Sequence, residues 1–255
     1  MTPRPSGTQA IDRAAELLTL VVESTTPRTF TELADETDLA KSTASRLLQA
    51  LERHGLLLRT SSGEFKPGPL FSVYALRHEP ADGLVDLASR TLRHIGEETG
   101  ETVNLTVPRA GVAVLVAQID SAFLLGATNW VGVDVPAHCS APGKVLYAYN
   151  ALPVPTEPLE ARTSSTITAP AALQRELRRV RRQGYAVSQE ELEAGLISVA
   201  APIRTRDGAT IAAVSVSGPT TRLTERAHAV GTMLVTETLR LSRQLGYRPD
   251  VDRKR

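Results

Sequence analysis

Apolar residues recur at helical spacing in three segments near the N-terminus of the chain. The first segment covers residues 9–24. The second follows Thr29, which fits a capping box with Glu32 because each side chain can bond a free backbone N–H group of the other residue. The third begins near Ala40, and a buried stripe is formed by Ala44, Leu47, Leu48 and Leu51. This pattern predicts three short helices, the last ending at Gly55 in a left-handed cap.

Two short extended runs flank Ser61–Gly63 directly after the third predicted helix, which is the pattern of a β-hairpin. Three helices followed by a hairpin predict a winged helix-turn-helix. The predicted third helix carries a polar face, and such a helix fits the major groove of DNA with its N-terminal residues at the base edges. The residues expected to contact bases are Thr43, Ser45 and Arg46. Those expected to contact phosphates are Lys41, Ser42, Arg59 and Lys66. The alternative is a small helical hairpin that packs against a partner protein.

The second part of the chain changes from helical spacing to alternation and then mixes the two. The alternating segment at residues 101–129, rich in Val and Leu, predicts three strands separated by turns at residues 108–111 and 120–121. Two further strands, "ISVAAPIR" and "TIAAVSVSGP", are joined by an Asp-Gly turn. Helices are predicted at 69–80, at 82–99, from the N-cap Ser140, at 170–183, and from Thr224 to about Leu245. Strands combined with helices predict a separate α+β domain.

Charge is distributed unevenly although the net charge of the 255 residues is only +1. Residues 11–38 hold two Arg against seven acidic residues, a net charge of −5, whereas residues 39–59 reach +3. The low net charge argues against a nonspecific coat on nucleic acid, but a local basic patch remains. The single Cys139 excludes an intrachain disulfide. No apolar run is long enough for a membrane span, and we expect a cytoplasmic protein with no membrane partner.

Several stretches resemble one family at matching places. "TELADETDLAKSTASRLLQALERHGLL" resembles the winged helix-turn-helix of the IclR family of bacterial transcription regulators. The family's ligand-binding domain is resembled by "GETVNLTV", "VPAHCSAPGKVLYAY", "RRQGYAVSQEELEAGLISVAAPI" and "AAVSVSGPTTRLT". The order of these stretches from about residue 9 to 246 makes the resemblance specific. The chain has Ala40 where the family often has Pro, and Ala44 where it has a bulkier residue, which changes the expected base preference but not DNA binding.

The resemblance implies an α+β protein with four parts: a winged helix-turn-helix domain at 1–69, a linker helix at 70–81, a GAF-like α/β effector-binding domain at 82–247, and a flexible tail at 248–255. It implies operator binding as a dimer or a dimer of dimers, controlled by a small metabolite. Regulators of this family repress more often than they activate. No catalytic residue, metal ion or other cofactor is implied.

The resemblance also implies an effector site. Its expected lining is Leu124, Leu125, Ala141, Pro142, Ser188, Leu196, Ser198, Ser215 and Ser217. Ser215 and Ser217 are two residues apart on one strand, so they share a face. A helix N-terminus at residues 140–143 next to hydroxyl groups suggests a carboxylate ligand. The alternative is that the serines lie at the edge of the core and bond the backbone.

The sequence therefore predicts a ligand-responsive, DNA-binding transcription regulator. Two alternatives remain open: a DNA-binding regulator whose second domain only oligomerises, and an enzyme that uses Cys139 or a metal ion. The acidic run of Glu190, Glu191 and Glu193 is interpreted as a solvated turn rather than an acid/base group. Lys144 lies near the helix N-terminus at residues 140–143, where its charge could support a carboxylate; the alternative is that its side chain points to solvent.

Overall fold

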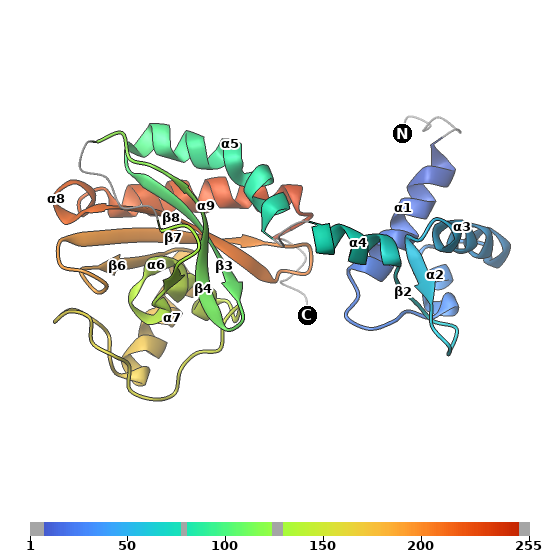
Figure 1. The fold of residues 1–255 in the computed structure, drawn as a ribbon, viewed down its shortest axis with the longest axis horizontal. Coiled ribbons are helices and arrows are strands. Elements are labelled where there is room, and N and C mark those ends of the chain that lie inside the picture. Colours follow the sequence, from blue (N-terminus) through green and yellow to red (C-terminus); the bar gives the residue numbers. More distant parts are fainter. Residues whose placement is uncertain (1–7, 78–80, 124–129, 250–255) are drawn as a thin grey trace. The chain divides into compact units, whose positions relative to one another are not determined.

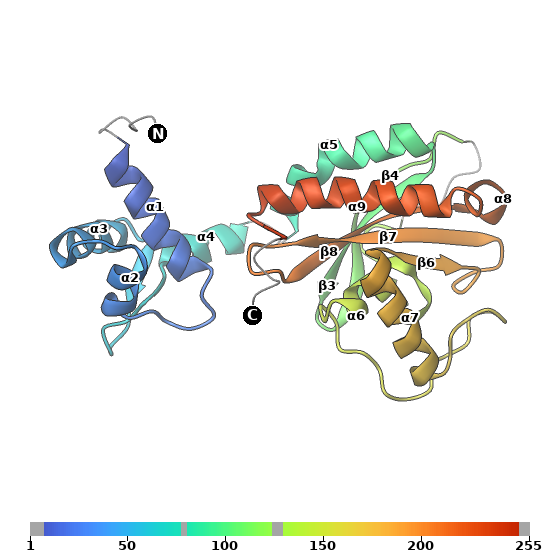
Figure 2. The same ribbon diagram turned by 180° about the vertical axis from the view of Figure 1, so that it is seen from behind.

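The computed structural model describes residues 8–77, 81–123 and 130–249. The chain divides into two compact units, Met1–Pro80 and Ala81–Arg255. Figures 1 and 2 show the elements of each unit from opposite sides. Among the described helices, none has both the length and the apolar character that a membrane span needs.

The first unit is a winged helix-turn-helix, as predicted. Its elements are α1 (Gln9–Val22), α2 (Phe30–Glu36), α3 (Lys41–Arg53), the antiparallel strands β1 (Leu57–Arg59) and β2 (Phe65–Pro67), and α4 (Pro69–Arg77). The predicted capping box is present, because Thr29 accepts from the backbone of Glu32 and the Glu32 carboxylate accepts from the backbone of Thr29. Gly55 has the predicted left-handed conformation, with a φ angle of 72°.

A single small core holds these three helices and the hairpin together. Its buried side chains are Leu17, Val21, Leu33, Leu48, Leu51, Leu57 and Phe65. The predicted stripe of α3 is therefore largely correct: Ala44, Leu48 and Leu51 are buried, whereas Leu47 is only partly buried. The hairpin is tied to the segment before α2, since Arg28 and Phe65 exchange two backbone hydrogen bonds of 2.8 and 2.7 Å. α3 thus has one face fixed in the core and the opposite face available.

The second unit is a six-stranded antiparallel sheet with helices on both faces. Its strands follow the order β5-β4-β3-β8-β7-β6. They are β3 (Thr102–Arg109), β4 (Val112–Ile119), β5 (Asp134–Val135), β6 (Ala186–Gln189), β7 (Leu196–Arg204) and β8 (Thr210–Pro219). The helices are α5 (Asp82–Thr99), a 3-10 turn η1 (Ala137–Cys139), α6 (Ala141–Ala148), α7 (Pro170–Gln183), α8 (Thr220–Leu223) and α9 (Ala227–Gln244). Figures 1 and 2 show α5 and α9 on one face, and α6 and α7 on the other.

Strand alternation separates the side chains of this sheet into two layers. The larger core lies under α5 and α9 and includes Val103 and Leu105 of β3 and Val214 and Val216 of β8. A smaller core lies under α6 and α7 and includes Ala200 and Ala213 with the helix residues Ala141, Val145 and Leu177. The residues that alternate with Val103, Leu105, Val214 and Val216 along β3 and β8 therefore lie on the opposite face of the sheet, which is the face toward α6.

The predicted elements of this unit are mostly confirmed. The helices predicted at 82–99 and 170–183 have those bounds, and Ser140 is the N-cap of α6. The last helix was predicted to start at Thr224, which is wrong: the separate short helix α8 ends at Leu223 and α9 begins at Ala227. Much of the strand predicted after residue 121 lies outside the described residues, and the described strand that follows is β5.

Lys144 is fully buried, so the alternative in which its side chain points to solvent is wrong. Its Nζ donates to the carbonyl oxygen of Val187 at 3.2 Å and forms an ion pair with the carboxylate of Glu191. Glu191 is 8% exposed, so the interpretation of a solvated turn is wrong for this residue. Val187 belongs to the edge strand β6, and Lys144 therefore joins α6 both to the edge of the sheet and to the turn that follows it.

The turn after β6 is also bonded to the long loop before α7. The hydroxyl groups of Thr163 and Thr166 donate to the carbonyl oxygens of Glu190 and Glu191 at 2.5 and 2.6 Å. Burial raises the pKa of Glu191, and the ammonium group of Lys144 opposes that rise by stabilising the carboxylate. The Lys144–Glu191 pair thus lies where α6, the edge strand β6, the turn after β6 and the loop before α7 are bonded to one another.

Breaking this pair from one side should leave a buried charge without a partner. Lys144→Met is expected to lower the free energy of unfolding by about 3–5 kcal/mol, and the double variant Lys144→Met/Glu191→Leu should recover most of that loss. Arg162→Met is a control, because the Arg162–Glu160 pair is exposed and should matter little. Urea denaturation measures all three. Equal effects of Lys144→Met and Arg162→Met would contradict the buried pair.

Candidate DNA-binding surface and effector site

The exposed face of α3 carries the residues that the sequence predicted for DNA contacts. Lys41, Ser42 and Arg46 are exposed, and Thr43 and Ser45 are partly buried. All five come from the first two turns of the helix, and the buried residues Ala44 and Leu48 lie on its core side. The structure therefore brings these five side chains together at one end of one helix.

The N-terminus of α3 differs from those of two other helices in how its backbone donors are used. In α2 and α6, the side chains of Thr29 and Ser140 accept from backbone N–H groups. The N-cap of α3 is Ala40, which has no side chain that can accept a hydrogen bond. Within the described residues, the N–H groups of Lys41 and Ser42 have no acceptor. A helix end of this kind can bind a phosphate through its backbone and its dipole.

The wing adds two basic side chains on the strands of its hairpin. Lys66 is exposed on β2. Arg59 is exposed at the end of β1, and its guanidinium lies 5.1 Å from the ring centroid of Phe65. This cation–π contact restrains Arg59 near the wing while leaving its N–H donors available. Arg28 pairs with Glu32 at 3.5 Å and also with Glu36, so two carboxylates of α2 are partly neutralised.

The predicted effector residues lie mostly around the first turn of α6. Ala141 and Pro142 form that turn, and both are buried. Four serines on the face of the sheet toward α6 are Ser188, Ser198, Ser215 and Ser217, and Leu196 begins β7 on the same face. Leu124 and Leu125 lie outside the described residues.

Two of these serines bond the backbone around the start of α6. The hydroxyl of Ser188 donates to the carbonyl oxygen of Cys139 at 2.6 Å. The N–H group of Ala141 donates to Ser198 Oγ at 3.3 Å, and that of Gly143 donates to Ser140 Oγ at 3.4 Å. Pro142 has no N–H group. The first-turn donors of α6 are therefore occupied, which weakens the expectation that they hold a carboxylate.

Three residues of β3 belong to the same face and were missed by the sequence reasoning. Thr102, Asn104 and Thr106 alternate with the core residues Val103 and Leu105. Thr102 pairs with Ser217 across the strands, and Asn104 pairs with Ser215. The alternation in "TVNLTV" is visible in the sequence and was the signal that could have identified them.

Cys139 does not have the properties of a nucleophile. It is fully buried, and burial together with the nearby Glu191 raises its pKa to about 11. Almost no thiolate forms at neutral pH under these conditions. The neighbouring His138 has its Nε2 2.9 Å from the carbonyl oxygen of Glu160. Within the described part of the chain, no group of three or more potential metal ligands comes together.

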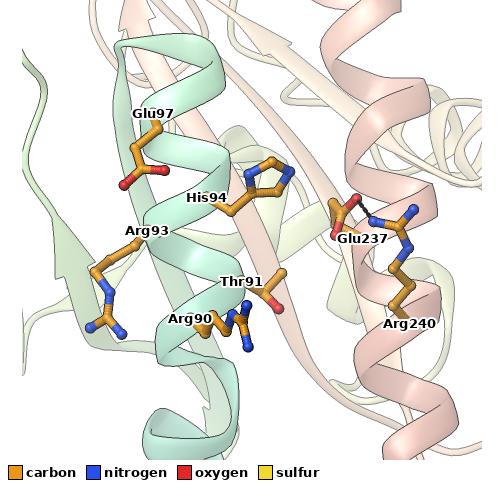
Figure 3. A pocket seen from close by; sticks show the side chains of 7 residues that line it. All are labelled: Arg90, Thr91, Arg93, His94, Glu97, Glu237 and Arg240. Atoms are coloured by element: carbon orange, nitrogen blue, oxygen red, sulfur yellow. Dashed lines mark hydrogen bonds and ion pairs between the residues drawn. The ribbon is translucent and has the colours of Figure 1, made fainter.

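A hollow of about 480 Å³ lies on the other face of the sheet, between α5 and α9. Figure 3 shows Thr91 and His94 turned toward α9, where Glu237 and Arg240 form an ion pair at 2.5 Å. The remaining lining residues are Arg90, Arg93 and Glu97. None of the residues predicted from the sequence lines this hollow.

Comparison with known proteins gives a consistent result over the whole chain. The IclR helix-turn-helix domain matches residues 10–61, and the C-terminal domain of the bacterial transcriptional regulator IclR matches residues 81–243. The HTH-type transcriptional regulator BhcR of Paracoccus denitrificans is 34% identical, covering 96% of this chain and 90% of that protein. The transcriptional repressor IclR of Escherichia coli is 29% identical, covering 91% and 88%.

The solved structures agree with the sequence comparisons. The crystal structure of IclR from Thermotoga maritima is 28% identical to this chain and has a TM-score of 0.60, covering 94% of this chain and 100% of that one. The matched families and relatives are transcriptional regulators rather than enzymes, so the enzyme alternative is not supported. The chain belongs to the IclR family of DNA-binding bacterial transcriptional regulators.

Proposed function

We propose that this regulator is a repressor that binds an operator as a homodimer through α3 and the wing, and that a small molecule bound beside α6 controls it. Several of its relatives are named repressors, which supports the direction of control. The observation that carries the proposal is the start of α3, where exposed polar side chains surround an N-terminus without a side-chain cap.

In this proposal the residues of α3 divide into two groups by position. The backbone N–H groups and side chains of Lys41 and Ser42 bind a phosphate, which places the helix in the groove. Thr43, Ser45 and Arg46 then contact base edges, with Arg46 suited to guanine because its two donors match O6 and N7. Arg59 and Lys66 of the wing bind phosphates beside the groove.

The dimer is supported by exposed apolar side chains on α4. Leu70, Val73 and Tyr74 are 52%, 40% and 55% exposed, and their spacing of three and four residues places them on one face of the helix. A stripe of this kind is suited to burial against the same stripe of a second copy, in which each residue meets its equivalent. Two copies present two α3 helices, which is how such motifs achieve useful specificity.

Control by a small molecule is supported by the polar face next to α6. Hydroxyl groups of Ser215 and Ser217 lie there, and the Ser188 and Ser198 bonds tie this face to the start of α6. A ligand that changes these bonds changes the position of α6. The alternative, in which the second domain only oligomerises, predicts that no small molecule alters operator affinity.

Arg46→Ala is expected to weaken operator binding by about 1–3 kcal/mol and to relax the preference at one base pair. Arg53→Ala is the matched control, because Arg53 is exposed on the last turn of the same helix and far from its N-terminus. Binding titrations against an operator and its single-base variants measure both effects. Equal losses for the two variants would show that the orientation proposed for α3 is wrong.

Lys41→Ala tests the phosphate contact separately. It should weaken binding to all sequences alike and reduce the slope of log affinity against log salt by about one. Titrations at several salt concentrations measure the slope. An unchanged slope, or a loss confined to particular sequences, would remove Lys41 from the phosphate contact.

Leu70→Glu should shift the protein from dimer toward monomer, because it places a charge in the apolar stripe of α4. Ser72→Glu adds the same charge at an exposed position of α4 outside the stripe and should leave the assembly intact. Light scattering coupled to size exclusion measures the molar mass. If Leu70→Glu remains fully dimeric, α4 does not form the interface.

A further inference from the structure

The face of β3 and β8 toward α6 carries polar side chains without partners. Within the described residues, Thr102, Thr106 and Ser215 make no side-chain hydrogen bond, and they are 1%, 0% and 2% exposed. Asn104 is 7% exposed, and its Oδ1 is sealed from solvent with no donor, as is Thr106 Oγ1. Cross-strand pairing places Asn104 beside Ser215 and Thr106 beside Ala213, so these groups form one cluster.

Such a cluster is unusual for a core because nearly all buried polar atoms in proteins have partners. An unsatisfied buried group lowers the stability of the folded chain, so its presence requires a compensating role. Of the four sealed and unpartnered side-chain atoms in the described residues, two belong to this cluster. The hydroxyls and the amide can each donate and accept, so together they match a ligand that does both.

The surroundings of the cluster exclude a strong anion site. The ammonium group of Lys144 is already paired with Glu191 and bonded to Val187. The N–H groups of Ala141 and Gly143 at the start of α6 already have acceptors. The unpartnered side chains on this face are all uncharged, and a buried anion without a cation or several donors is strongly disfavoured.

We infer that the small-molecule site of this regulator takes an uncharged, polyhydroxylated ligand, with Asn104 and Thr106 among its contacts. This inference rests on the proposed control by a small molecule and defines the chemical class of that molecule. It differs from the carboxylate that the helix N-terminus alone suggests. The hydroxyl groups of the ligand supply a donor to Asn104 Oδ1 and partners to Thr106, Ser215 and Thr102.

The first test needs no ligand. Thr106→Val keeps the shape of the side chain and removes the unpartnered hydroxyl, so the melting temperature of the unliganded protein should rise by about 2–4 °C. The matched control is Thr238→Val, because Thr238 is 2% exposed and its hydroxyl donates to the carbonyl oxygen of Leu234 at 2.8 Å. That variant should melt at a lower temperature. A lower melting temperature for Thr106→Val would overturn the inference.

The second test uses two sets of probes at equal ionic strength. Glycerol, D-xylose and D-glucose are the uncharged probes, and sodium acetate, propionate and benzoate are the carboxylates. At least one uncharged probe should raise the melting temperature of the natural chain through binding, and Thr106→Val and Asn104→Ala should lose that shift. The inference fails if no uncharged probe gives such a shift, if both variants retain it, or if only carboxylates bind.

The failure of this inference and the failure of the proposed function give different results. A probe that binds through Asn104 and Thr106 but leaves operator affinity unchanged supports the ligand class and removes the proposed control. A carboxylate that binds and changes operator affinity supports the control and overturns the ligand class. Operator titrations with and without the bound probe separate these cases.

Discussion

The second domain depends on how α6 is held against the sheet, where buried polar bonds add to the apolar contacts of the smaller core. A fully buried ammonium group must have a carboxylate and further acceptors nearby, and Glu191 and the carbonyl oxygen of Val187 supply them to Lys144. Ser188 and Ser198 add bonds to Cys139 and Ala141. These bonds use the charge of Lys144 and the first-turn donors of α6, and the unpartnered polar side chains that remain on this face are uncharged. The same attachment therefore fixes the helix and underlies the uncharged ligand class that we propose for this face.

The N-termini of α3 and α6 differ in whether their backbone N–H donors have acceptors within the fold. At α6 the donors are used within the fold by Ser140 and Ser198. At α3 the N-cap is Ala40, so the donors of Lys41 and Ser42 stay available at an exposed surface. An N-terminus that the fold does not satisfy is suited to an external phosphate. This difference explains why DNA contacts are proposed at α3 while a carboxylate is not proposed at α6.

The sequence predicted what depends on local rules and missed what depends on distant partners. The helix at 82–99 followed from apolar periodicity. The ends of this helix and of the charged helix at 170–183 followed from Gly100 and Gly184, which have the left-handed conformation. The burial of Lys144 could not be predicted in this way, because Glu191 lies 47 residues away along the chain. Ser198 likewise caps a helix 57 residues earlier. Only the folded sheet brings these groups together.

The most direct test of the account is selection of genomic DNA fragments by the purified full-length protein, followed by sequencing. The account predicts enrichment of an inverted repeat whose half-site centres lie about one helical turn, or a small multiple of it, apart, since a symmetric dimer presents two α3 helices. Selection is performed at moderate salt with and without a metabolite pool, and folding is checked by circular dichroism. No enriched repeat under either condition would contradict specific dimeric binding through α3.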